Sequence, residues 1–178
     1  MTPTSHDLAK QFLTQARRVL EKEHLPRITR CLGLLREEEI WWRPNPASNS
    51  VGNLVLHLAG NVRQWIISGL GGALDLRERD REFAELGPLP RRVLIARLQN
   101  TVTEAGRVLS RLGARDLASK RPIQRFRVTG LEAVLHVAEH FAYHSGQIVY
   151  VTKLRRGENL SFTRLPGEKR KRPNLPSL

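Results

Sequence analysis

The sequence predicts an all-α protein, folded as a four-helix bundle. In four stretches of the chain, apolar residues recur at spacings of three and four, the pattern of a helix with one buried face. Proline and glycine separate these stretches, and the alternation typical of strands is almost absent. The 178 residues suffice for one domain with a substantial core. Four helices joined by two long connections can bury their apolar faces in a bundle.

Caps and breakers delimit the first two helices. The first is expected to begin near Ser5, and Pro26 predicts a kink or a restart because its ring cannot continue the helical hydrogen bonds. The second is expected from about Val51 to Leu70. Ser50 is a favourable N-cap for this helix, and the Gly71-Gly72 pair ends it.

The third helix is expected after Pro88 and Pro90 and ends at Gly113. A stretch rich in Arg, Asp and Glu, from Asp75 to Gly87, precedes it. We expect this stretch to be an exposed crossover, because nothing in its composition indicates a buried face.

The fourth helix has the clearest beginning and end. Thr129 and Glu132 have the spacing of a capping box, in which each side chain binds the backbone amide of the other. No breaker follows before Gly157. Ahead of the helix, residues 125–128 alternate in polarity and indicate a short extended piece.

Charge and cysteine content restrict the class of protein. The net charge is +13, and residues 164–178 contain five basic residues, one acid and three prolines. We therefore divide the chain into a bundle, residues 1–163, and a basic flexible tail, residues 164–178. Cys31 is the only cysteine, which excludes an internal disulfide and a cysteine-rich zinc site. No apolar run approaches a membrane span and no leader is visible, so a cytoplasmic protein is expected.

Three of the six histidines, His136, His140 and His144, lie on the fourth helix at spacings of four. Residues four apart on a helix share one face, and two imidazoles so placed can reach one metal ion. His136 and His144 are about 12 Å apart along the axis and cannot easily share an ion. The spacing therefore leaves two alternatives, the pair His136/His140 and the pair His140/His144.

A third ligand has to come from another helix, and His57 is the only histidine on the second one. The alternative interpretation is that these are chance spacings and that His57 is a hydrogen-bonded core histidine. Against it, the fourth-helix pair lies among apolar residues, where an unpaired imidazole is costly to bury. The small and polar residues that follow, Ser145-Gly146-Gln147, stand where a cavity is expected.

Two stretches of the chain resemble a known family. Residues 136–148, HVAEHFAYHSGQI, resemble the last-helix motif of the DinB/YfiT-like superfamily, and residues 50–61, SVGNLVLHLAGN, resemble its second-helix motif. The resemblance implies a four-helix bundle in up-down-down-up order with long crossover connections. It also implies that His57, His140 and His144 bind one divalent ion and that His136 does not. Family members include thiol-dependent transferases and related enzymes, and they are often homodimers.

A site with three histidine ligands leaves a coordination position open, which is typical of catalytic metals. We expect zinc or nickel, with iron or manganese as alternatives. The expected activity is that of a thiol-dependent transferase or a hydrolase acting on a small molecule, with a low-molecular-weight thiol as the expected partner in the first case. The catalytic residues are not identified. The polar neighbours are candidates either to assist the ligands or simply to face solvent, and they are Asn61, Glu139, Tyr143 and Gln147.

The second hypothesis is a basic helical protein that binds nucleic acid or serves as a scaffold, with structural histidines. The net charge of +13 and the run Lys169-Arg170-Lys171-Arg172 favour it. However, the chain shows neither a nucleic-acid-binding motif nor basic residues interleaved with aromatic ones. We therefore expect neither nucleic acid nor a membrane as the partner.

Overall fold

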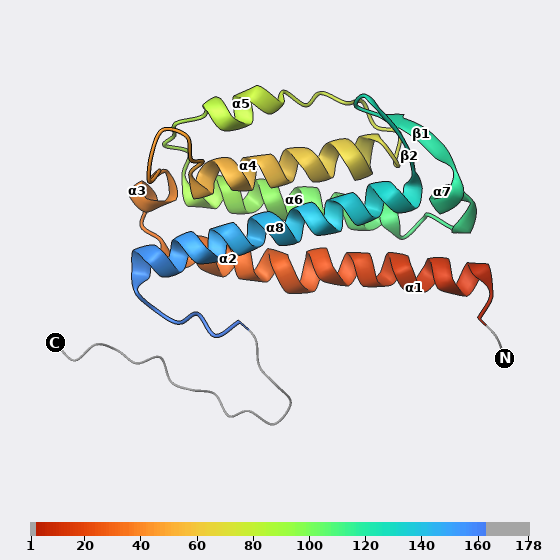
Figure 1. Cartoon of the computed structure of the whole chain (residues 1–178), viewed down its shortest axis with the longest axis horizontal. Helices are drawn as coiled ribbons and strands as arrows, with labels where there is room; N and C mark the ends of the chain where they lie inside the picture. The colour runs from red at the N-terminus through yellow and green to blue at the C-terminus, as the bar shows by residue number, and fades with distance from the viewer. Residues whose placement is uncertain (1–2, 163–178) are drawn as a thin grey trace.

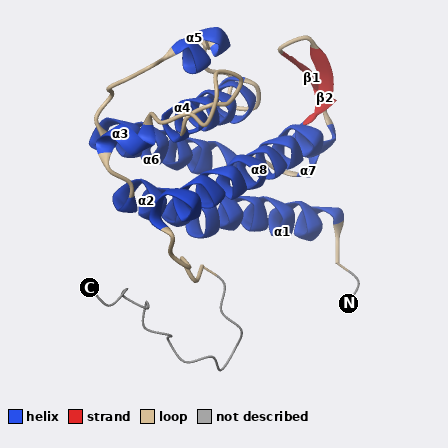
Figure 2. Cartoon of the chain, turned by 60° about the vertical axis from the view of Figure 1, so that its left-hand side comes forward, coloured by secondary structure: helices blue, strands red, loops and turns tan. Residues whose placement is uncertain are grey.

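The computed structural model describes residues 3–162, and these fold mostly into helices, as predicted. Long helical segments lie side by side around an apolar core, and a small hairpin closes one end (Figures 1 and 2). Within the described part of the chain, no helix is long and apolar enough to cross a membrane. The predicted tail, residues 164–178, lies outside the described residues, so its boundary stays a prediction.

The chain begins with a long helical rod. Helix α1 (Ser5–Arg18) is capped by Thr4, one residue before the predicted cap, and continues through a π-helical segment, η1 (Val19–His24), into α2 (Leu25–Leu34). Pro26 falls in the first turn of α2, where its missing amide proton costs little. The restart predicted at Pro26 is therefore a π-helical segment, wider than an α-helix, that precedes the proline. The helix continues beyond it.

The second rod carries the first of the candidate ligands. After the short α3 (Glu37–Ile40), Ser50 caps α4 (Val51–Val62), which continues as the π-helical η2 (Arg63–Ser68). The hydroxyl of Ser50 accepts a hydrogen bond from the Asn53 amide at 3.1 Å, so the predicted N-cap is confirmed. Almost every residue of α4 is buried, which makes it the central helix of the core.

The crossover after η2 differs from its prediction. It contains a short helix, α5 (Arg79–Ala84), that lies over α4 in Figure 1. Most of the crossover is exposed, but Glu82 is buried and the side chain of Arg77 is only 4% exposed. The predicted exposed crossover is therefore confirmed for most of its residues, whereas Arg77 and Glu82 depart from it because these two charged side chains pair with each other beneath the surface. Helix α6 (Arg91–Leu109) then starts after Pro90, as predicted.

The last part of the chain returns along the core. Helix α7 (Ala114–Ala118) leads into an antiparallel hairpin of β1 (Lys120–Ile123) and β2 (Phe126–Thr129), which confirms a short extended piece in this region. Helix α8 (Gly130–Arg156) follows, with the predicted capping box at its start and Gly157 in the left-handed conformation at its end. Helix α8 packs against both α2 and α4. Its candidate ligands therefore lie beside the second rod, which carries the other one.

Candidate metal centre

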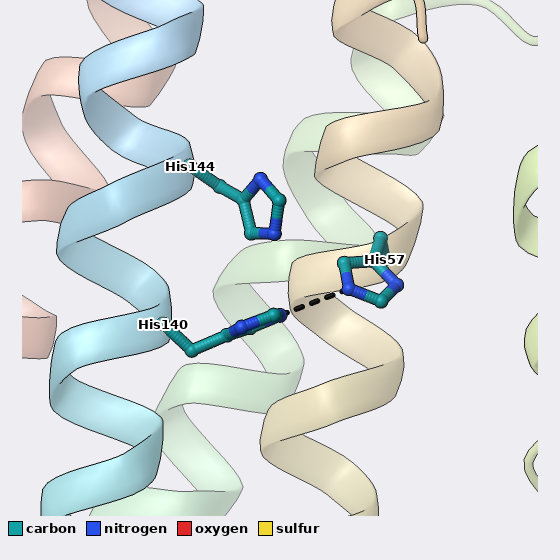
Figure 3. A group of neighbouring side chains, drawn as sticks. All are labelled: His57, His140 and His144. Atoms are coloured by element: carbon teal, nitrogen blue, oxygen red, sulfur yellow. Dashed lines mark hydrogen bonds between the residues drawn. The ribbon is translucent and has the colours of Figure 1, made fainter. Parts of the chain in front are cut away.

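The structure brings three histidines together between α4 and α8. His57 comes from the middle of α4, whereas His140 and His144 lie one turn apart on α8, and the three rings point toward one another in Figure 3. Their nitrogen atoms lie within 4.8 Å of one another. Of the two pairs that the spacing left open, His140/His144 is the one that meets His57.

The donor set fits a divalent transition-metal ion. Nε2 of His57 and Nε2 of His140 are 2.9 Å apart. The centre of the His144 ring lies 5.1 Å from the ring centre of His57 and 4.5 Å from that of His140. Two nitrogens that bind one ion at 2.0–2.1 Å are at most about 4.2 Å apart. The nitrogen separations in the cluster, which reach at most 4.8 Å, are close to this limit.

The protonation of the fourth-helix histidines also suits metal binding. Burial, together with the neighbouring histidines, lowers the pKa of His140 to about 3. Burial also lowers the pKa of His144, although its hydrogen bond with Gln147 acts in the opposite direction. Both imidazoles are consequently neutral near pH 7, and a neutral imidazole has a lone pair to donate.

A buried ion pair fixes the orientation of His57. Nδ1 of His57 lies 2.9 Å from Oε2 of Glu82, and Arg77 donates to both oxygens of the same carboxylate, at 2.8 and 2.9 Å. Nη2 of Arg77 also lies 3.1 Å from Nδ1 of His57, but this nitrogen already donates to Oε2 of Glu82 at 2.9 Å. The Nδ1 proton of His57 is therefore directed to the nearer carboxylate, which can only accept. This tautomer leaves the lone pair on Nε2, which faces His140.

Glu82 remains ionised in this environment. Burial raises the pKa of its carboxyl group, but the hydrogen bonds from Arg77 and His57 outweigh burial and hold the pKa below its ordinary value. A carboxylate behind a metal-binding histidine fixes the ring and makes it a stronger ligand. Glu82 and Arg77 thus belong to the candidate site, although the sequence did not indicate them.

One local signal could have located them. Gly60 lies in the last turn of α4, where the helical rod continues into η2, and a glycine inside a helix costs about 1 kcal/mol relative to alanine. A Cβ atom there would collide with Oε1 of Glu82 and lie 2.9 Å from Nε of Arg77. The glycine marks the place where the ion pair approaches the backbone of α4.

The other polar neighbours proposed from the sequence have different positions. Oε1 of Gln147 accepts a hydrogen bond from Nδ1 of His144 at 2.6 Å, which leaves Nε2 of that histidine free to bind a metal. Tyr143 is exposed and its ring lies 5.0 Å from that of His144. Glu139 is exposed on α8 and makes no hydrogen bond or ion pair within residues 3–162.

His136 lies outside the cluster. Its Nε2 is 3.2 Å from Nδ2 of Asn61, and its ring packs at a tilt of 34° against Trp65, with 4.0 Å between the ring centres. The Asn61 amide nitrogen can only donate, so Nε2 of His136 is an acceptor that is already used. His136 and Asn61 together form a polar contact between α8 and α4, next to the three-histidine cluster.

A cavity of about 890 Å³ adjoins the three histidines. Its lining includes Arg79 and Phe83 of α5 and Tyr143 and Tyr150 of α8. Phe83 packs against His57, with 4.6 Å between the ring centres. A small molecule in this cavity would contact the ligand histidines directly, so the cluster is accessible to a substrate.

Comparisons with known proteins agree with this architecture. Residues 7–169 match the model of DUF1572, described as a protein of unknown function. No curated protein matches the chain. Among solved structures, a DinB-like protein from Bacillus cereus ATCC 10987 has a TM-score of 0.58 and 18% identity, covering 75% of this chain and 86% of its own. A conserved protein from Enterococcus faecalis has a TM-score of 0.64 and 19% identity, covering 84% and 96%. The chain therefore belongs to the DUF1572 family and has the fold of DinB-like proteins.

Proposed function

We propose that this protein binds one divalent metal ion through His57, His140 and His144. The observation that carries the proposal is the convergence of three histidine nitrogens within 4.8 Å at the edge of a cavity. Two of the three rings also have a partner, Glu82 or Gln147, that directs the other ring nitrogen away from the ion. Zinc and nickel are the proposed ions, because both accept imidazole ligands readily.

The proposed activity is that of a metal-dependent enzyme, a thiol-dependent transferase or a hydrolase. When bound, such an ion lowers the pKa of a coordinated thiol or water and so supplies a nucleophile near neutral pH. The residues of the chain have supporting tasks. His57, His140 and His144 hold the ion, Glu82 and Gln147 hold the ligand tautomers, and the cavity places the substrate beside them.

We also propose a helix order, an oligomeric state and a cellular location for the protein. An up-down-down-up order is supported by Figure 1, in which α4 and α6 run in one direction while the α1–α2 rod and α8 run in the other. A homodimer in the cytoplasm is proposed as well. Sedimentation at several protein concentrations tests the dimer.

Metal analysis of the untagged protein tests the proposed site. We expect about one equivalent of metal per chain after loading with zinc or nickel and removal of the excess. The His140→Ala variant should retain far less, whereas a His24→Ala variant, altered at a histidine on η1 outside the cluster, should retain the full equivalent. Equal uptake by the His140→Ala variant and the parent would disprove the site.

An activity screen tests the enzyme. The metal-loaded protein is incubated with electrophilic small molecules and a panel of low-molecular-weight thiols, and product formation is followed by mass spectrometry. A transferase produces thiol adducts, and a hydrolase produces hydrolysed substrate without a thiol. Neither product should form with the His140→Ala variant.

A further inference from the structure

We propose that the cavity beside the three histidines recognises a small organic anion, whose acidic group binds Arg79 while its metal-binding atom reaches the histidine site. The proposal names a substrate class for the proposed function and rests on it. For a thiol-dependent enzyme, the ligand is a thiol that also carries a carboxylate, sulfonate or phosphate group. Three observations support it, namely the charges in the cavity wall, the placement of Arg79 and the charge balance of the site.

The cavity wall contains no acidic side chain. Among the described residues that line it, Arg79 carries the only permanent charge, and the other polar groups are amides, hydroxyls and the three imidazoles. A negatively charged group entering the cavity would therefore meet a guanidinium without repulsion from the wall. A cationic ligand would be repelled by the same guanidinium and would find no acidic side chain in the wall.

Phe83 positions the guanidinium of Arg79. Arg79 and Phe83 lie one turn apart on α5, and the Cζ atom of Arg79 sits 4.9 Å from the centre of the Phe83 ring. The same ring packs against His57. The Phe83 ring thus lies between Arg79 and His57, and a small molecule is long enough to reach from the guanidinium to the ligand histidines. Within residues 3–162, no carboxylate pairs with Arg79, so its donors are available.

The charge balance of the site also favours an anion. An imidazole binds a metal ion as a neutral ligand, so the three histidines add no charge to the occupied site, and the charges of Glu82 and Arg77, paired at 2.8 Å, offset each other. The two charges of a bound divalent ion are consequently left without a counter-charge from the protein. A thiolate bearing an acidic group supplies two negative charges, one at each end of the cavity.

The cavity also accommodates an apolar spacer between the two charged ends. Tyr143 and Tyr150 of α8, which are 65% and 70% exposed, also line the cavity. Their ring faces offer contact to methylene groups without requiring a polar partner. The recognised molecule is therefore expected to have a donor atom for the metal, a short carbon chain and a terminal acid.

A pair of matched thiols tests the proposal. The full-length protein is loaded with cobalt(II), and 3-mercaptopropanesulfonate and the neutral 3-mercaptopropanol are titrated separately while the thiolate-to-cobalt absorption is recorded. Sulfonate is a poor ligand for transition metals, so its effect does not arise from chelation of the cobalt. We expect the sulfonate to bind about three- to tenfold more tightly, as for a partly exposed charge-assisted contact.

Two arginine variants separate the effect of Arg79 from that of net charge. Arg79→Gln should remove the preference for the sulfonate and leave mercaptopropanol binding unchanged. Arg81→Gln, on the same helix but outside the lining of this cavity, should preserve the preference. Equal cobalt uptake by all three proteins shows that the variants are folded.

The outcomes distinguish the two proposals. A protein that takes up no cobalt disproves the metal site, and the anion proposal falls with it. A protein that takes up cobalt but binds neither thiol, or binds both equally, disproves only the anion proposal. A preference that persists in Arg79→Gln also disproves it, because the acidic group would then have another partner.

Discussion

Nδ1 of His57 lies 2.9 Å from Oε2 of Glu82, so a side chain of the α4–α6 crossover fixes a proposed metal ligand in the centre of α4. The carboxylate is held in turn by Arg77. The geometry of the proposed site therefore depends on how this connection packs on the bundle, in addition to the helices that carry the histidines.

Replacing Glu82 by glutamine should weaken metal binding about 10- to 100-fold, because the amide can no longer direct the Nδ1 proton of His57 as a carboxylate does. Competition with a zinc chelator measures the affinity. Glu78→Gln, at an exposed glutamate that pairs with Arg81, is the matched control and should bind zinc like the parent. If the two variants behave alike, Glu82 does not support the site.

Gly60→Ala should produce a similar loss without changing any charge. The added methyl group displaces the Glu82 carboxylate and Arg77, so we expect weaker zinc binding and a destabilisation of about 1–3 kcal/mol. In contrast, Gly33→Ala in α2 has no neighbour within 4 Å and should stabilise the protein by about 0.5–1 kcal/mol. Urea unfolding of the metal-free proteins gives both free energies. A neutral effect of Gly60→Ala would show that the ion pair adapts freely.

The fourth-helix histidines should differ sharply in their effect on metal affinity. His140→Ala and His144→Ala each remove a proposed ligand and should reduce zinc affinity more than Glu82→Gln does. His136→Ala should retain one equivalent of zinc, because its Nε2 is bound to Asn61 outside the cluster. Calorimetric titration with zinc measures all three. If His136→Ala lost the metal and His144→Ala retained it, the ligands on α8 would instead be His136 and His140.

Lowering the pH should destabilise the metal-free protein already at pH values above those at which carboxylates titrate. The pKa of His140 falls from 6.5 to about 3 on folding, so between pH 6.5 and 4.5 the unfolded chain binds a proton that the folded chain does not. Stability therefore decreases as the pH falls through this window, by up to about 1.4 kcal/mol per pH unit for one such group. Urea unfolding at several pH values should show a shallower dependence for His140→Gln. An unchanged slope would contradict the assignment to His140.

The single thiol should be inert in the folded protein. Cys31 is fully buried on α2, and burial raises the pKa of its thiol above the ordinary value. A chromogenic disulfide reagent should react with it at least about 100-fold faster in 6 M guanidinium chloride than in buffer. Rapid reaction of the native protein would place a nucleophilic thiol on the chain itself, and the need for a separate thiol substrate would lapse.

The main helices and the three histidines could be predicted because their signals are local. Ser50 and Thr129 cap the helices that bear the ligands, and the spacing of four puts His140 and His144 on one face. The spacing did not distinguish His144 from His136. That choice depends on which ring meets α4, and only the resemblance indicated it in advance.

Arg77 and Glu82 could not be predicted in the same way. They lie five residues apart in a polar stretch without helical periodicity, in which charged side chains are normally solvated. Their burial results from pairing with each other and with His57, which is 20 residues from Arg77 and 25 from Glu82 along the chain. Such tertiary pairing leaves no periodic trace in the sequence, apart from the glycine at position 60 that accommodates it.

The packing of the crossover on α4 has a kinetic consequence. Segments that are mostly exposed and contain a single short helix open locally at a lower free-energy cost than the core does. Opening of residues 75–87 would withdraw Glu82 from His57 and uncover one wall of the cavity while the helices stay folded. Ion exchange would then follow the opening rate of this segment, and amide hydrogen exchange on α5 would report the same rate.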